Sequence, residues 1–129
     1  MSAPAEKRKV LRVLVADDEK HVARLVQVNL ERLGHEVELA HDGLEARDMA
    51  LSGQYDLLVL DIMMPHMDGV KVLKTLRRDA RTKNLKVVIL TVKAQDQDIL
   101  RGFESGADFY LTKPFNPDEV AHLIEQITL

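Results

Sequence analysis

Side chains that can bind cations or phosphate stand at the ends of four short apolar segments. Three carboxylates, a hydroxyl and an ammonium are placed in this way: Asp17 and Asp18 after residues 11–16, Asp61 after 56–60, Thr91 at the end of 86–91, and Lys113 after 108–112. If these ends meet, the carboxylates repel one another and one lysine does not balance them. Oxygen ligands of this kind suit a hard divalent cation. Mg²⁺ fits best, because it takes one or two carboxylates and keeps several waters.

The same set can carry phosphoryl transfer, a reaction that depends mostly on in-line positioning and neutralised charge. The cation and Lys113 would hold the phosphoryl oxygens, and the Thr91 hydroxyl would donate a hydrogen bond to one of them. Asp61 would be the nucleophile and would form an acyl phosphate. This chemistry would explain why the apolar run LLVL (57–60) leads straight into an ionisable acid.

The periodicity of the chain predicts the elements that bring these residues together. Apolar segments rich in β-branched residues predict five strands, at 11–16, 36–40, 56–60, 86–91 and 108–112. Helical spacing, stop glycines and the capping residues Asp42 and Asn116 predict five helices, at about 20–33, 42–52, 70–78 and 95–104 and from 116–117 onward. Their strict alternation indicates a doubly wound α/β fold, with a parallel sheet and helices on both faces.

The distribution of polar residues also predicts the strand order. Strands 1, 3 and 4 are nearly continuous apolar runs, as burial on both faces requires, whereas strands 2 and 5 are shorter or more polar and suit the edges. Right-handed crossovers leave few such orders, and 2-1-3-4-5 is one of them. Ligands of these sheets bind beyond the carboxyl ends of the strands where the order reverses, which here is between strands 1 and 3.

The bulk properties of the chain narrow the class of protein. The 129 residues, 46% apolar and 30% charged, suit one globular domain at 9–129 preceded by a disordered tail at 1–8. The absence of cysteine excludes disulfides, thiolate metal sites and thiol nucleophiles. A formal charge of −3 argues weakly against direct nucleic-acid binding by this domain. We find neither a membrane-spanning apolar run nor a secretory signal, so a cytoplasmic protein is expected.

Four motifs resemble those of one known family, the receiver domain of two-component response regulators. They are VADDE (15–19), LVLDIMMPHMDG (58–69), ILT (89–91) and YLTKPF (110–115), and the match covers about residues 9–128. The resemblance implies the flavodoxin-like 2-1-3-4-5 fold. It also implies phosphorylation of Asp61 by a sensor histidine kinase, a phosphotransfer protein or a small phosphodonor. Such a domain is a signalling switch that catalyses only its own phosphorylation and dephosphorylation.

The resemblance further implies roles for single residues. Mg²⁺ would be bound directly by Asp18, Asp61 and the backbone carbonyl of Met63, and through water by Asp17. Thr91 and Lys113 would hold the phosphoryl group, and the Lys113–Pro114 peptide bond would be cis, a form that X–Pro bonds adopt at low cost.

A change of shape would follow phosphorylation. Thr91 and Tyr110 match the switch residues of the family. The output surface would be helix 4, strand 5 and helix 5, with Tyr110 and Phe115, which would act on a downstream protein or an attached output domain. A phosphorylation-dependent homodimer of this chain is a further hypothesis.

Two positions depart from the common pattern. The residue after Thr91 is usually small and is Val92 here, and Met63 is bulky and apolar. Because a branched side chain can obstruct water and Met63 cannot orient it by a hydrogen bond, we expect the phosphorylated form to decay slowly.

Other interpretations exist for the same residues. Asp17 and Asp18 alone could cap the next helix, Tyr110 could be an ordinary edge aromatic, and Arg77–Arg78 are expected to be solvated charge. A haloacid-dehalogenase-like phosphatase would need an Asp where Met63 stands, and nucleotide-binding modules would need a G-x-G-x-x-G or P-loop motif that is absent. A degenerate receiver that only binds a partner is the remaining alternative.

Overall fold

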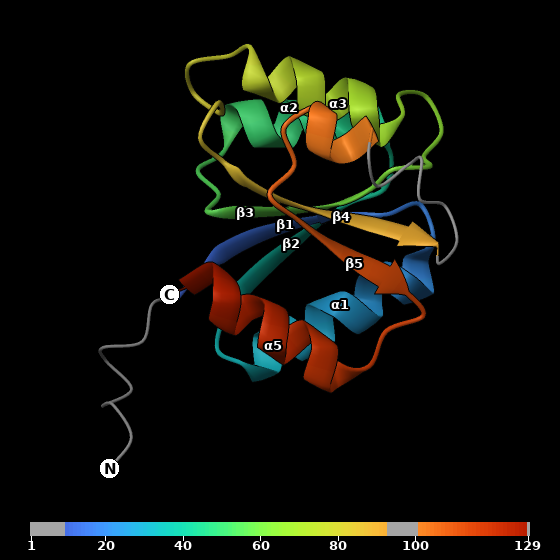
Figure 1. Cartoon of the computed structure of the whole chain (residues 1–129), viewed down its shortest axis with the longest axis vertical. Coiled ribbons are helices and arrows are strands. Elements are labelled where there is room, and N and C mark those ends of the chain that lie inside the picture. Colours follow the sequence, from blue (N-terminus) through green and yellow to red (C-terminus); the bar gives the residue numbers. More distant parts are fainter. Residues whose placement is uncertain (1–9, 93–100, 129) are drawn as a thin grey trace.

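Five parallel strands form the centre of the molecule, in the order β2-β1-β3-β4-β5 (Figure 1). The computed structural model describes residues 10–92 and 101–128. The strands are β1 (Arg12–Ala16), β2 (Glu36–Ala40), β3 (Leu57–Asp61), β4 (Lys86–Val92) and β5 (Phe109–Lys113). The predicted fold class and strand order are therefore confirmed, and each strand begins and ends within one residue of its predicted bounds.

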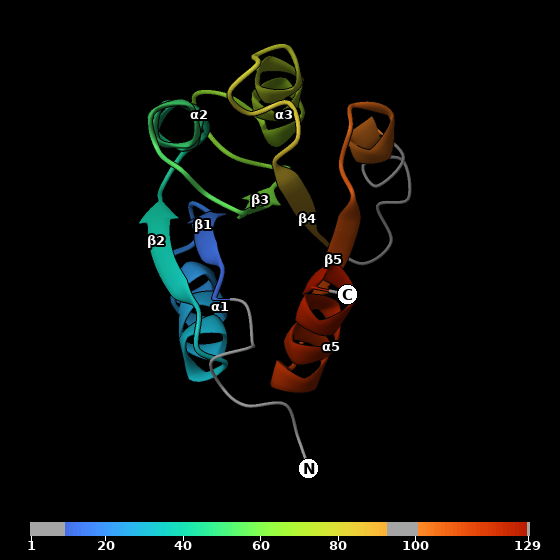
Figure 2. The same cartoon turned by 90° about the vertical axis from the view of Figure 1, so that its left-hand side faces the viewer.

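Helices cover both faces of this sheet, as the alternation predicts. They are α1 (Lys20–Arg32), α2 (Gly43–Ser52), α3 (Gly69–Arg77) and α5 (Pro117–Thr128). Figure 2 shows α2 and α3 on one face and α1 and α5 on the other. Residues 101–104, between β4 and β5, are helical and belong to the helix predicted at 95–104, whose first six residues lie outside the described ranges.

Side-chain caps explain where three of the helices begin. The carboxylates of Asp42 and Asp68 accept hydrogen bonds from the N–H groups of Glu45 and Lys71, at 2.8 and 3.0 Å. Asn116 Oδ1 accepts from the Glu119 N–H at 2.9 Å. Each bond satisfies an N–H that the first helical turn leaves without a partner. The caps predicted at Asp42 and Asn116 are thus confirmed.

Two apolar layers hold the sheet and helices together. Alternate residues of a strand face opposite sides, so Leu14 and Leu58 pack toward α2 and α3, whereas Val13 and Val59 pack toward α1 and α5. All five residues of β3 are buried, but β2 and β5 are partly exposed along their length. This pattern is the one expected for a central strand and for edges. It places Asp61 at the end of a strand whose residues are all buried.

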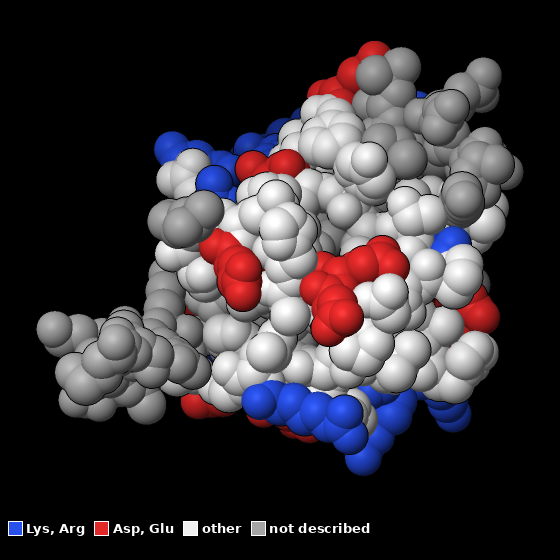
Figure 3. Space-filling view, turned by 60° about the horizontal axis from the view of Figure 1, so that its bottom comes forward, with Lys and Arg blue, Asp and Glu red and all other residues white. Residues whose placement is uncertain are grey.

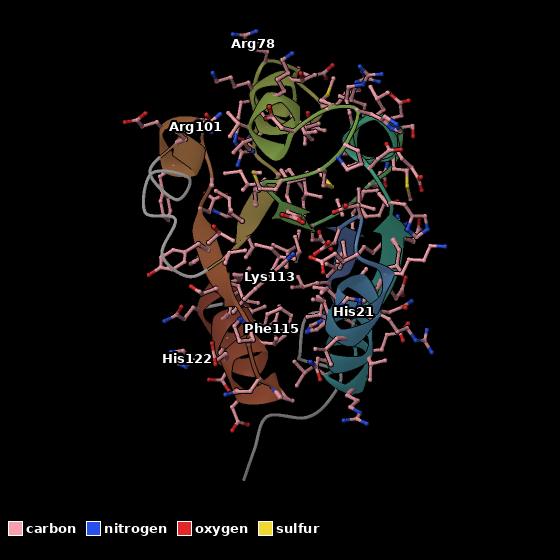
Figure 4. The ribbon with its side chains drawn as sticks, turned by 90° about the vertical axis from the view of Figure 1, so that its right-hand side faces the viewer. His21, Arg78, Arg101, Lys113, Phe115 and His122 are labelled. Carbon is pink, nitrogen blue, oxygen red and sulfur yellow. The ribbon has the colours of Figure 1, made fainter. Side chains whose placement is uncertain are left out.

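Arg77 contradicts the expectation of solvated charge. Its side chain is 20% exposed, and its guanidinium donates hydrogen bonds to the carbonyls of Leu85 (2.6 Å) and Gly106 (2.7 and 2.9 Å) and to Asp108 (3.1 Å). Gly106 has φ +109°, and a Cβ there would lie 2.9–3.2 Å from the Arg77 side chain. The neighbouring Arg78 is exposed, as expected (Figure 4).

The surface charge is unevenly distributed. On the side that carries α1 and α5, acidic side chains gather in separate patches, and basic side chains lie mainly along the margins (Figure 3). None of the helices in the described ranges is long and apolar enough to cross a lipid bilayer.

Candidate functional site

A hollow of about 240 Å³ opens at the carboxyl ends of the strands. Five of the predicted site residues line it, and they come from four different segments: Asp18, Asp61, Met63, Thr91 and Lys113. Another predicted site residue, Asp17, is fully buried and lies in contact with Lys113. The sheet therefore brings together the residues that the strand ends predict.

Asp61 is the last residue of β3 and is held in place by its surroundings. It pairs in register with Leu90 of β4, is 5% exposed, and accepts a hydrogen bond from the Met63 N–H at 3.0 Å. The loop that follows folds back onto the strand, with Gly69 N–H donating to Ile62 O at 3.0 Å. A Cβ at Gly69 would lie 2.6 Å from the Asp61 carbonyl oxygen, so this close return of the chain requires glycine.

Lys113 is the cation of the site and faces three carboxylates. Its Nζ lies 2.9 Å from Asp17 Oδ2, 3.2 Å from Asp61 Oδ2 and 3.4 Å from Glu19 Oε1. Burial by itself lowers the pKa of Lys113, but the contacts with Asp17 and Asp61 outweigh it and the pKa is raised. The ammonium therefore stays charged over the physiological pH range.

The electrostatic balance of the site is negative. Burial raises the pKa of Asp61 from its usual value near 3.8 to about 6, and the charge of Asp17 adds to this, although the Met63 N–H and Lys113 act in the opposite direction. A carboxyl whose pKa rises beside a lysine is short of positive charge. A further cation would therefore stabilise the carboxylates of this site.

The donor set fits Mg²⁺. Carboxylate oxygens of Asp17, Glu19 and Asp61 lie within 4.8 Å of one another. Asp17 Oδ2 is buried and accepts no hydrogen bond, because its 2.9 Å contact with Lys113 is an ion pair without hydrogen-bonding geometry. Buried carboxylate oxygens without a donor are suitable ligands for a hard cation. Asp18 lines the same hollow with an exposed side chain.

Glu19 is the acidic residue of this cluster to which the sequence assigned no role. Its position in VADDE, directly after the predicted pair, was the available signal. Asp17 is more than a helix cap: its Oδ1 accepts the Glu19 N–H at 2.9 Å, and its Oδ2 faces Lys113.

The two residues proposed as a switch have different surroundings. Thr91 is buried, and its hydroxyl makes one long contact, with Val92 O at 3.5 Å. Tyr110 lies outside the hollow, is 48% exposed, and packs edge-to-face against Phe103 with ring centroids 6.0 Å apart. The Lys113–Pro114 peptide bond is cis, as the resemblance implied.

The fold and this acidic pocket define a doubly wound domain of the receiver type, and comparison with known protein families gives the same result. Residues 13–125 match the model of the response regulator receiver domain. The chain belongs to this family.

Relatives agree with the assignment. The chain is 46% identical to the DNA-binding dual master transcriptional regulator RpaA of Synechocystis over 84% of its own length and 45% of the relative. It is 43% identical to the alkaline phosphatase synthesis transcriptional regulatory protein PhoP of Bacillus subtilis, over 90% and 48%. The chain thus spans less than half the length of these two curated relatives.

Solved structures agree as well. A putative response regulator from Chloroflexus aurantiacus superposes with a TM-score of 0.88 at 33% identity, covering 93% of this chain and 98% of that one. The receiver domain of a Francisella response regulator superposes with a TM-score of 0.82 at 37% identity, covering 92% and 96%.

Proposed function

We propose that this domain is a phosphorylation-controlled switch that accepts a phosphoryl group on Asp61. One observation carries the proposal. The Asp61 carboxylate ends the central buried strand, and Lys113 lies 3.2 Å from it in a negatively charged hollow open to solvent. A buried acid with a raised pKa beside a fixed cation is the arrangement of a functional site, because it costs stability and needs a compensating gain.

Each residue of the hollow has a part in the transfer. An Asp61 oxygen attacks the phosphorus of the donor, the bond from phosphorus to the donor's leaving group breaks, and the leaving group departs with its electron pair. Lys113 then donates to the transferred phosphoryl oxygens, and the Thr91 hydroxyl donates to another. Asp18, Asp61 and the Met63 carbonyl are the proposed direct ligands of Mg²⁺, and Asp17 would reach it through water. The cation would supply positive charge against the phosphoryl oxygens.

Membership of the family supports the proposed donor and output. A sensor histidine kinase or a phosphotransfer protein would supply the phosphoryl group. The output surface would be the helix that includes residues 101–104, together with β5 and α5, with Thr91 and Tyr110 coupling it to Asp61. Two relatives are named as transcriptional regulators and are about twice as long as this chain, which supports control of an attached output domain. A phosphorylation-dependent homodimer through the same surface is part of the proposal.

Incubation with acetyl phosphate tests the transfer. With Mg²⁺, the intact protein should gain the mass of one phosphoryl group, and hydroxylamine should remove it because an acyl phosphate is the product. Without Mg²⁺, or in Asp61→Asn, the adduct should be absent. An adduct that persists in Asp61→Asn, or that resists hydroxylamine, overturns the proposal.

A further inference from the structure

Glu19 is the partner of Lys113 with the greatest freedom to move. The side chains of Asp17 and Asp61 are 0% and 7% exposed, whereas that of Glu19 is 50% exposed. Asp17 and Asp61 are anchored at strand ends by backbone N–H groups, at 2.9 and 3.0 Å. Among these three carboxylates, Glu19 can therefore leave the ammonium at the smallest cost, since an exposed ion pair is worth about 1 kcal/mol or less.

The Glu19 side chain extends toward Lys113 and does not cap its own helix. Glu19 is the N-cap residue of α1, but its side chain makes no capping hydrogen bond. Oε1 lies 3.4 Å from Lys113 Nζ, and Oε2 lies 3.8 Å from His21 Nε2 on the exposed side of α1 (Figure 4). The carboxylate thus lies between the Lys113 ammonium and the His21 imidazole.

We propose that Glu19 is a positioning residue that holds Lys113 before phosphorylation and must release it to the incoming phosphoryl group. This inference rests on the proposed function of Asp61. Lys113 donates hydrogen bonds to Glu19 and Asp61 and forms an ion pair with Asp17, so incoming phosphoryl oxygens compete with these carboxylates for the ammonium. Glu19 is the one that can withdraw, and its charge at the mouth of the hollow also opposes anionic donors.

Replacement of Glu19 should therefore accelerate phosphorylation. With acetyl phosphate at low ionic strength, we expect Glu19→Gln to raise the rate about 3- to 10-fold, and the gain should shrink at high salt because exposed charges are screened. Glu31→Gln is the matched control. It removes the same charge from an exposed position on the same helix, about 18 Å farther along its axis, and should leave the rate unchanged.

A second variant separates the contact from the charge. Glu19→Asp keeps the negative charge but shortens the side chain, so it should also be faster than the wild type if the contact with Lys113 is what restrains the reaction. A rate equal to the wild type in Glu19→Asp, with a faster Glu19→Gln, contradicts the proposed holding of Lys113.

Mg²⁺ binding in the absence of a phosphodonor gives a readout that does not depend on activity. Glu19 is one of the three clustered carboxylates, but the proposal assigns it to Lys113 and not to the cation, so a titration followed by NMR should give Glu19→Gln a Kd less than about fivefold above the wild type. A weakening of more than about tenfold would make Glu19 a metal ligand and overturn the inference. If the wild type is phosphorylated on Asp61 and Glu19→Gln reacts like Glu31→Gln, this inference fails and the proposed function stands.

Discussion

Two cations, at opposite ends of the same pair of strands, have opposite surroundings. At the amino ends of β4 and β5, Arg77 donates hydrogen bonds to backbone carbonyls and to one carboxylate, Asp108. Asp108 in turn accepts the Val87 N–H at 2.9 Å, so each charge in this cluster is matched. At the carboxyl ends, Lys113 faces three carboxylates at once.

The two clusters have different consequences: the Arg77 cluster stabilises the fold, whereas the Lys113 cluster favours reaction at the site. The Arg77 cluster satisfies buried donors and acceptors and ties α3 to the turn before β5, which is a structural task. The Lys113 cluster has excess negative charge and buried carboxylate oxygens, which lowers stability but prepares the site for a cation and a phosphoryl group. Variants at the two ends should therefore affect stability with opposite signs.

The largest expected effect is at the Arg77 end. Arg77→Met should lower the free energy of unfolding by about 2–4 kcal/mol, because the carbonyls of Leu85 and Gly106 lose the guanidinium donor and the Asp108 carboxylate loses its cationic partner. Urea unfolding followed by circular dichroism measures this. Arg78→Met, at the exposed neighbouring residue, is the control and should change stability by less than about 0.5 kcal/mol. Equal losses in the two variants would show that the Arg77 cluster is not structural.

At the Lys113 end, removal of charge should stabilise the protein. The pKa of Asp61 is raised from about 3.8 to about 6, so in this window the folded protein binds a proton that the unfolded chain releases. Stability therefore falls as the pH rises through the window. Asp61→Asn should avoid this fall and be more stable than the wild type by about 1–2 kcal/mol at pH 7.5, with the advantage lost below about pH 4.

Asp108→Asn is the matched change at the other end. It should lower stability at pH 7.5, because it weakens the contact with Arg77. Thermal unfolding of both variants at pH 4 and 7.5 gives the comparison. A destabilised Asp61→Asn at neutral pH would mean that the charge at the site is fully compensated.

The smallest expected effect concerns the lifetime of the phosphorylated form. Val92 and Met63 line the hollow with side chains that are 57% and 68% exposed, so they stand at its mouth. Val92→Ala should open the approach of water to Asp61 and speed the loss of phosphate about 2- to 5-fold, or roughly 0.4–1 kcal/mol in activation free energy. Intact mass measured over time after removal of the donor follows this loss. An unchanged rate would show that Val92 does not limit the loss of phosphate.

The sequence was sufficient to predict the fold and the convergence of the strand ends, because both follow from local patterns. Because β3 is buried on both faces, its residues are expected to be apolar, and Asp61 at its end is therefore recognisable in the sequence as an exception. Asp42 and Asn116 mark helix starts for an equally local reason.

Glu19 and Arg77, whose contacts were not predicted from the sequence, have long and charged side chains. The partners of Glu19 and Arg77 lie 94 and 29 residues away along the chain, on Lys113 and Gly106. Where a long flexible side chain ends depends on tertiary packing and not on local spacing. The same limit applies to Tyr110, whose ring orientation depends on Phe103.

Chemical trapping of the phosphorylated residue tests the central claim most directly. Borohydride reduces an aspartyl phosphate to homoserine, and peptide mapping by mass spectrometry then locates the modified position. After treatment with acetyl phosphate and Mg²⁺, we expect homoserine at position 61 alone. Homoserine at Asp17 or Asp18, or none at any position of a protein that has gained a phosphoryl group, would contradict the assignment of Asp61 as the acceptor.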